Sequence, residues 1–136
     1  MYLGIDYGQK RIGLAIGSQY PRGIGTLQIS GSFDNAIEKI AVVCNDNEVE
    51  KIIVGTPVKL SGQPGEITGE INTFARNLSK KTGLPVVFEE EGYTSTQAEE
   101  ELRARGVEYR SDPGKIDELA AVLILEQYIN RQARNK

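Results

Sequence analysis

Residues 2–17 read YLGIDYGQKRIGLAIG, and this stretch decides the fold that we expect. Apolar residues alternate with glycine, alanine or aspartate on both sides of a short polar break at Gly8-Gln9-Lys10. Alternation with a period of two, repeated after a turn, predicts an antiparallel β-hairpin. Asp6 stands out, because an ionised carboxylate in a central strand is costly unless something pairs with it. Taken alone, Asp6 is better explained as a cap on the hairpin turn.

The composition fits one globular domain over residues 1–136, with 39% hydrophobic and 26% charged residues. The chain has 19 acidic and 16 basic residues, a net charge of −3 and no histidine. Histidine-based triads and histidine-ligated zinc are therefore excluded, which leaves carboxylates as the candidate chemical groups. The single cysteine, Cys44, cannot form an intrachain disulfide, and we expect it in the core. Without a long apolar segment or a signal-peptide pattern, we expect a cytoplasmic protein that binds no membrane.

The rest of the chain alternates between predicted strands and helices. We expect a strand at 24–29, a helix capped by Ser32, a strand at 51–55, a helix from 67 to about Gly83, a strand at 84–88, a helix from Thr94 and a last helix at 115–131. This order predicts an α/β fold. Its mixed five-stranded sheet combines a three-stranded antiparallel meander with two parallel strands and carries helices on both faces.

Three acidic residues, Asp6, Glu91 and Asp117, are expected to converge in this topology. Right-handed crossovers place the strand at 51–55 beside the first strand, and the last helix packs over the crevice at their ends. Small residues that follow Asp117, among them Ala120, allow this helix to approach the sheet closely. Three neighbouring carboxylates repel one another unless a hard cation lies among them, and oxygen ligands favour Mg²⁺ or Mn²⁺. Two such ions would stabilise the attacking and leaving oxygens of a phosphodiester displacement.

The acidic run Glu89-Glu90-Glu91 has a second explanation. A solvated acidic turn accounts for these three residues equally well on the local sequence alone. If the strand continues through them, alternation places Glu89 and Glu91 on one face and Glu90 on the other. Strand geometry therefore separates Glu90 from Glu91 and does not choose between Glu89 and Glu91.

Four motifs carry a resemblance to a known family over nearly the whole chain. GIDYGQKRIGLAI, IVGTPVKLSGQPG, FEEEGYTS and KIDELAAVLIL resemble, in order, the four motifs of the YqgF/RuvX family. The resemblance implies the ribonuclease H-like fold and a metal-dependent nuclease that matures the 5′ end of the 16S ribosomal RNA precursor. Cleavage of DNA junctions, by analogy with RuvC-type resolvases, is a second implication. The matching acidic positions are Asp6, Glu91 and Asp117, so the resemblance favours Glu91 over Glu89.

Two positions depart from the family pattern. The third motif of the family usually reads Asp-Glu-Arg, but Glu90, Glu91 and Gly92 stand here, and Ser18 replaces a frequent aspartate. The missing arginine removes a group that could bind a phosphate or pair with a carboxylate. We expect basic residues elsewhere to hold the nucleic acid, although each alone is also explained as a solvated surface charge. These residues are Lys10, Arg11, Lys59, Arg110 and Lys115.

Two other classes of function stay open. The altered third motif and the net negative charge favour a nucleic-acid-binding module of the same fold with weak or lost catalysis. A phosphotransferase of the actin and sugar-kinase type has a first phosphate loop similar to GIDYG, but it needs two such domains and a second glycine-rich loop. For the nuclease, the expected partner is precursor ribosomal RNA or branched DNA, and we expect a monomer or a weak homodimer.

Overall fold

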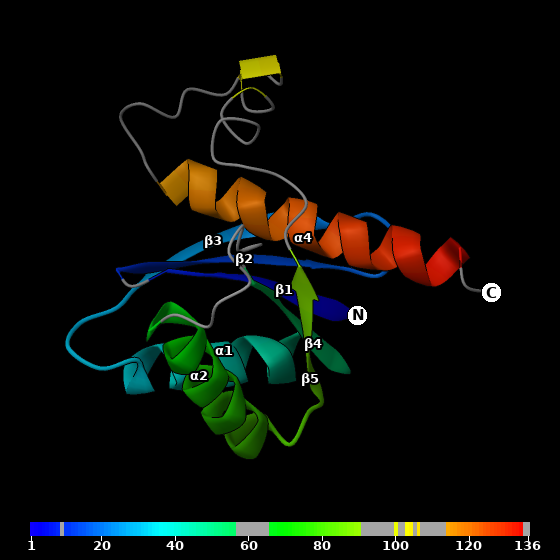
Figure 1. The fold of residues 1–136 in the computed structure, drawn as a ribbon. Coiled ribbons are helices and arrows are strands. Elements are labelled where there is room, and N and C mark those ends of the chain that lie inside the picture. Colours follow the sequence, from blue (N-terminus) through cyan, green and yellow to red (C-terminus); the bar gives the residue numbers. More distant parts are fainter. Residues whose placement is uncertain are drawn as a thin grey trace.

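The sheet of this protein is covered by helices on both sides (Figure 1). The computed structural model describes residues 1–8, 10–56, 66–90, 100, 103–104, 106 and 114–134. The strands are β1 (Tyr2–Tyr7), β2 (Arg11–Gly17), β3 (Arg22–Gln28), β4 (Lys51–Thr56) and β5 (Val86–Glu90), and the helices are α1 (Asp34–Asp46), α2 (Glu66–Thr82) and α4 (Gly114–Arg134). The predicted loop after Thr56 and most of the helix predicted from Thr94 lie outside the described residues.

The five strands pair in the order β3-β2-β1-β4-β5. The pairs β1–β2 and β2–β3 are antiparallel, whereas β1–β4 and β4–β5 are parallel. This arrangement confirms the predicted meander, the two parallel strands and the position of β4 beside β1. The pairing register also aligns one residue from each of four strands in a row: Gly13, Asp6, Gly55 and Glu89. Residues paired in this way point to the same face of the sheet.

The two faces of the sheet belong to different cores. Helices α1 and α2 cover one face and α4 covers the other (Figure 1). Leu3 and Ile5 of β1 are buried in the core under α1 and α2. Ile53 of β4 is buried in the second core with the apolar residues of α4. Within the described segments, no helix has the length and apolar content needed to cross a membrane.

Strands β3, β4 and β5 have bounds that differ from the sequence-based prediction. Strand β3 begins at Arg22 rather than at residue 24, because the ladder with β2 continues beyond an irregularity next to Leu14. Strand β5 covers Val86–Glu90 rather than 84–88, because β4 extends to Thr56 and pairs with the end of β5. Glu89 and Glu90 are therefore strand residues, and a solvated turn does not describe them.

The predicted helix cap at Ser32 is wrong. Helix α1 begins at Asp34, and Phe33 occupies the cap position without a side-chain hydrogen bond. The Ser32 Oγ atom lies 3.4 Å from the backbone nitrogen of Asp34, so the hydroxyl contacts the first turn from one residue further out. Helix α2 has the predicted extent, and α4 extends beyond the predicted range of 115–131 at both ends.

Candidate functional site

The first half of α4 lies directly on the backbone of the sheet. A Cβ atom at Gly13 of β2 would overlap the backbone carbonyl of Asp117, and a Cβ atom at Gly4 of β1 would lie 2.9 Å from the backbone oxygen of Ala121. The predicted close approach of the helix is therefore confirmed. Its physical basis is glycine in the strands, because an added side chain at either position requires the helix to move.

Asp6 and Asp117 are both next to Gly13, on the α4 side of the sheet. Asp6 is partly buried and pairs directly with Gly13 on one side and Gly55 on the other. Neither neighbour has a side chain, and on the Gly13 side the backbone of Asp117 occupies the position that a side chain would take. Asp117 lies above Gly13 in the first turn of α4. Two predicted acidic residues from opposite ends of the sequence thus occupy one region.

The third predicted acidic residue, Glu91, lies outside the described residues. In the described part of the chain, no group of three histidine, cysteine, aspartate or glutamate side chains is placed to hold a metal ion. The acidic triad therefore stays a prediction.

Arg11 forms an ion pair with a candidate acidic residue. Its Nε atom donates a hydrogen bond to Asp117 Oδ2 at 2.7 Å, with side-chain exposures of 32% and 22%. The pair joins β2 to α4 at the edge of the site. Lys10 is exposed in the β1–β2 turn and Lys115 in the first turn of α4, so these cations lie in chain segments next to the pair. The predicted binding residues Lys59 and Arg110 lie outside the described residues.

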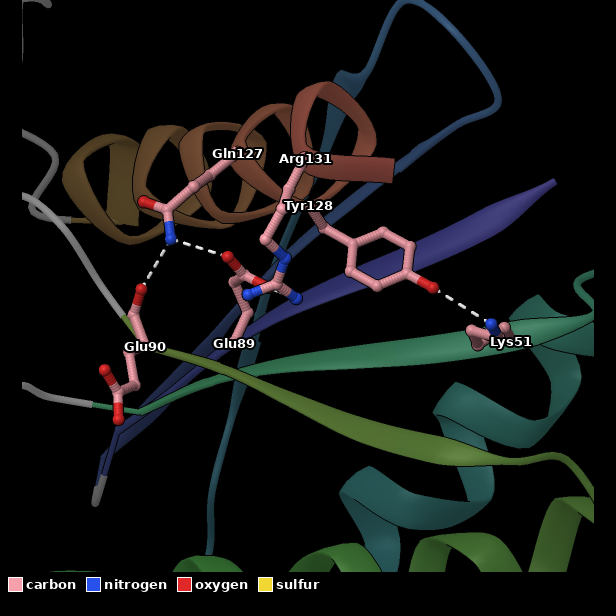
Figure 2. A network of polar contacts seen from close by, with 6 residues as sticks. All are labelled: Lys51, Glu89, Glu90, Gln127, Tyr128 and Arg131. Atoms are coloured by element: carbon pink, nitrogen blue, oxygen red, sulfur yellow. Dashed lines mark hydrogen bonds and ion pairs between the residues drawn. The ribbon is translucent and has the colours of Figure 1, made fainter. Parts of the chain in front are cut away.

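Glu89 is the buried carboxylate on the α4 side of the sheet, and it is 1% exposed. Its Oε2 atom accepts a hydrogen bond of 2.6 Å from Gln127 Nε2, and its Oε1 atom lies 2.5 Å from an Arg131 guanidinium nitrogen. Gln127 Nε2 also donates to the backbone oxygen of Glu90 at 2.6 Å. Figure 2 shows Gln127 and Arg131 extending from α4 to Glu89, while the Glu90 carboxylate points away from the helix.

A second contact holds the same end of α4. Lys51 Nζ, at the start of β4, donates a hydrogen bond of 2.9 Å to the hydroxyl of Tyr128, and this bond raises the pKa of Lys51 (Figure 2). The Tyr128 ring also packs edge-on against Tyr2. Together with the Glu89 contacts, these interactions fix the C-terminal half of α4 over β4 and β5.

Sequence reasoning missed this structural role of Glu89. Alternation placed Glu89 on the same face as Glu91, and the structure confirms that Glu89 and Glu90 point to opposite faces. The partners Gln127 and Arg131 lie about forty residues away in a helix that is apolar in its middle, so no local pattern linked them to Glu89.

The fold defines the class of protein. The chain has the ribonuclease H-like fold of the RuvC resolvases. RuvC from Thermus thermophilus superposes with a TM-score of 0.59 at 16% identity, covering 96% of both chains. A fowlpox virus resolvase in complex with Holliday junction DNA superposes with a TM-score of 0.57 at 14% identity, covering 96% of this chain and 97% of the resolvase.

Within this class, the chain belongs to the RuvX family, whose model carries the description "Holliday junction resolvase" and matches residues 1–131. A relative from Syntrophus aciditrophicus, named "Putative pre-16S rRNA nuclease", is 38% identical over 98% of this chain and 91% of its own length. A relative of the same name from Anaeromyxobacter dehalogenans is 36% identical over 96% of this chain and 97% of its own length.

Proposed function

We propose that this protein is a metal-dependent nuclease, a hydrolase that cleaves phosphodiester bonds of structured nucleic acid. The observation that carries the proposal is the position of Asp6 between Gly13 and Gly55, with Asp117 of α4 above Gly13. Membership of the RuvX family and the names of the relatives support the same conclusion. The extent of the family match also supports a single catalytic domain over residues 1–136.

Asp6, Glu91 and Asp117 are the residues that we propose as ligands of Mg²⁺ or Mn²⁺. Their donors are carboxylate oxygens, which these hard cations prefer, and the glycine at position 13 lets α4 bring Asp117 onto the strand that pairs with the strand of Asp6. A bound pair of such ions supplies Lewis-acid stabilisation to the attacking and leaving oxygens. Arg11 uses one N–H for Asp117, and its other guanidinium donors suit a substrate phosphate.

The proposed substrate is the precursor of 16S ribosomal RNA, processed at its 5′ end in the cytoplasm. The names of the relatives support this choice. The description of the family supports a second candidate, a four-way DNA junction. For either substrate we propose phosphate contacts from five basic residues of a monomer or weak homodimer: Lys10, Arg11, Lys59, Arg110 and Lys115.

A cleavage assay tests the proposal directly. Wild type and Asp6→Asn are incubated with precursor 16S RNA and with a four-way junction, in Mg²⁺, Mn²⁺, Ca²⁺ or chelator. We expect wild type to cleave in Mg²⁺ or Mn²⁺ and not in Ca²⁺, whose looser coordination misplaces the attacking water. We expect Asp6→Asn to be about a thousandfold slower, because metal stabilisation of the transition state contributes several kcal/mol. Full activity in chelator contradicts the metal mechanism, and binding without cleavage in Mn²⁺ indicates a binding module.

Three single glutamine variants locate the third ligand. We expect Glu91→Gln to lose cleavage while it stays folded, and Glu90→Gln, the matched control whose carboxylate points away from α4, to retain cleavage. We expect Glu89→Gln to lower the unfolding free energy and to retain cleavage in the folded fraction, because Glu89 is bound to α4. If Glu90→Gln is inactive, the third ligand is Glu90, and the assignment of Glu91 as that ligand is wrong.

A further inference from the structure

A groove on the other side of β5 from Glu89 combines basic side chains with an exposed aromatic ring. The groove has a volume of about 650 Å³ and lies between α2 and β5, an edge strand of the sheet. Its walls include Asn72, Arg76 and Lys80 from α2, together with Val86 and Phe88 from β5. No acidic residue is among the described residues that line it, although the chain as a whole carries a net charge of −3.

Phe88 presents its ring to solvent in this groove. It is 43% exposed, whereas Phe74, which packs against Tyr7 and Phe33 in the core, is fully buried. The ring contacts between described residues do not include Phe88. An exposed aromatic side chain on an edge strand therefore offers a face on which a planar ligand group can stack.

Arg76 and Lys80 place two positive charges beside this ring. They are four residues apart on α2 and both exposed, so their side chains are neighbours on one helix face, with Cβ atoms about 6 Å apart. The ion pairs formed between described residues include neither of them. Lys81, the next residue, lies 3.9 Å from Glu38 of α1, outside the groove. The groove thus combines two cations with an aromatic face.

We propose that this groove binds a single-stranded segment of nucleic acid, with a base stacked on Phe88 and backbone phosphates at Arg76 and Lys80. A cationic track with an aromatic platform is the combination by which proteins hold single strands without sequence preference. A duplex does not satisfy it, because its bases are already stacked and paired. Charge complementarity favours a polyanion over a second copy of this acidic chain.

The groove and the candidate active site share strand β5. Because Phe88 and Glu89 are consecutive strand residues, their side chains point to opposite faces of the sheet. A single strand in the groove therefore lies on the α2 side of β5, whereas Asp6 lies on the α4 side of the sheet. This proposal rests on the proposed function, because it takes nucleic acid as the ligand. It adds a binding site for an unpaired segment of the substrate.

Anisotropy titrations of a fluorescein-labelled 12-nucleotide oligouridine, with the whole chain in chelator, test the groove without cleavage. We expect Phe88→Ala to weaken binding about fivefold or more, with an unchanged salt slope, because it removes one stacked base. We expect Arg76→Gln/Lys80→Gln to reduce the slope of log K against log salt by about 0.7 for each lost phosphate contact. The matched controls are Lys81→Gln and Tyr20→Ala, and we expect each to change affinity less than about twofold.

Two further probes separate the possible occupants. Phe88→Leu keeps most of the apolar volume, so it replaces Phe88→Ala if the latter does not fold, and we expect the same loss of affinity. An abasic 12-mer should bind wild type and Phe88→Ala equally, because it has no base to stack. Three results would each overturn the proposal. They are no detectable binding of oligouridine by wild type, Phe88 variants that bind as tightly as wild type, and a double variant that keeps the salt slope of wild type. Tighter binding of blunt duplex, or Phe88-dependent self-association in place of RNA binding, also overturns it.

The outcome is independent of catalysis. We expect Asp6→Asn to bind oligouridine at least as tightly as wild type, because the substitution removes a negative charge on the other face of the sheet. If no substrate is cleaved but the Phe88 and salt effects appear, the nuclease function fails and the groove stands. If cleavage depends on Asp6 but the groove variants bind normally, the groove fails and the nuclease function stands.

Discussion

The two faces of the sheet differ although the same strands form both. In β1, Leu3 and Ile5 are fully buried under α1 and α2, whereas Gly4 and Asp6 lie on the side of α4. Branched side chains fill the first face. On the second face, glycine brings the helix backbone within contact of the strands, and carboxylates lie where apolar side chains would otherwise pack.

In β1, the residues that stabilise the fold and the residue that we propose for catalysis therefore lie on opposite faces of the sheet. The face under α1 and α2 contributes apolar burial, at about 25 cal/mol for each Å² removed from water. The face under α4 has no side chain at Gly13 or Gly55, on either side of Asp6, and the backbone of α4 lies directly on Gly13. Glu89 shows that an acidic residue on the same face can instead be structural, because Gln127 and Arg131 bind it.

Gly13→Ala is expected to have the largest effect on stability. Its Cβ atom would overlap the carbonyl of Asp117, so α4 must shift, and we expect the unfolding free energy to fall by about 3 kcal/mol or more. Gly69→Ala in α2 is the matched control, because nothing lies within 4 Å of its Cβ position and alanine favours a helix by up to about 1 kcal/mol. Urea denaturation measures both. Wild-type stability of Gly13→Ala would show that α4 does not rest on β2.

Glu89→Ala should cause the second-largest loss of unfolding free energy. The substitution leaves Arg131 and Gln127 without their buried partner, and we expect a loss of about 3 kcal/mol, reduced to the extent that the half-exposed Arg131 is solvated. Glu90→Ala, one residue further on an exposed position, should cost less than about 0.5 kcal/mol. Thermal melts of the two variants give the comparison. Equal losses would mean that the contacts of Glu89 with α4 do not stabilise the fold.

The sheet could be predicted from the sequence because alternation and chain order are local signals. Period-two patterns located the strands of residues 2–17, and the crossover rule placed β4 beside β1. The ion pair between Arg11 and Asp117 could not be predicted, because its partners are 106 residues apart and no local pattern links them. The contacts of Glu89 with Gln127 and Arg131 could not be predicted either, because both partners lie in α4, far from Glu89 in the sequence.

Ile5→Val tests the other face with a smaller change. Ile5 is fully buried under α1 and α2, and removal of one methyl group should cost about 1 kcal/mol. Because the next residue, Asp6, points to the opposite face, we expect the cleavage rate of the folded variant to match wild type. A large loss of cleavage at unchanged folding would show that the two faces are not functionally separate.

Cys44 of α1 should react slowly with alkylating agents, because its thiol is buried in the core. It is 4% exposed, and burial raises the pKa of its thiol to about 11. The reactive thiolate is then about a thousandth of the population at pH 8. We expect alkylation by iodoacetamide to be slow in native protein, to rise about tenfold for each pH unit up to 11, and to be fast in urea. Rapid native alkylation at pH 8 would contradict the buried position.

Thermal melts of wild type and Asp6→Asn, in chelator and in millimolar Mg²⁺, test the metal site most directly. If Asp6, Glu91 and Asp117 share one site, each repulsive pair costs about 1 kcal/mol without metal. Asp6→Asn should then melt about 3 °C higher than wild type in chelator. Mg²⁺ should stabilise wild type, because it binds the folded site, and should stabilise the variant much less. If Asp6→Asn melts lower in chelator and neither protein responds to Mg²⁺, then Asp6 caps the hairpin and the nuclease proposal loses its physical basis.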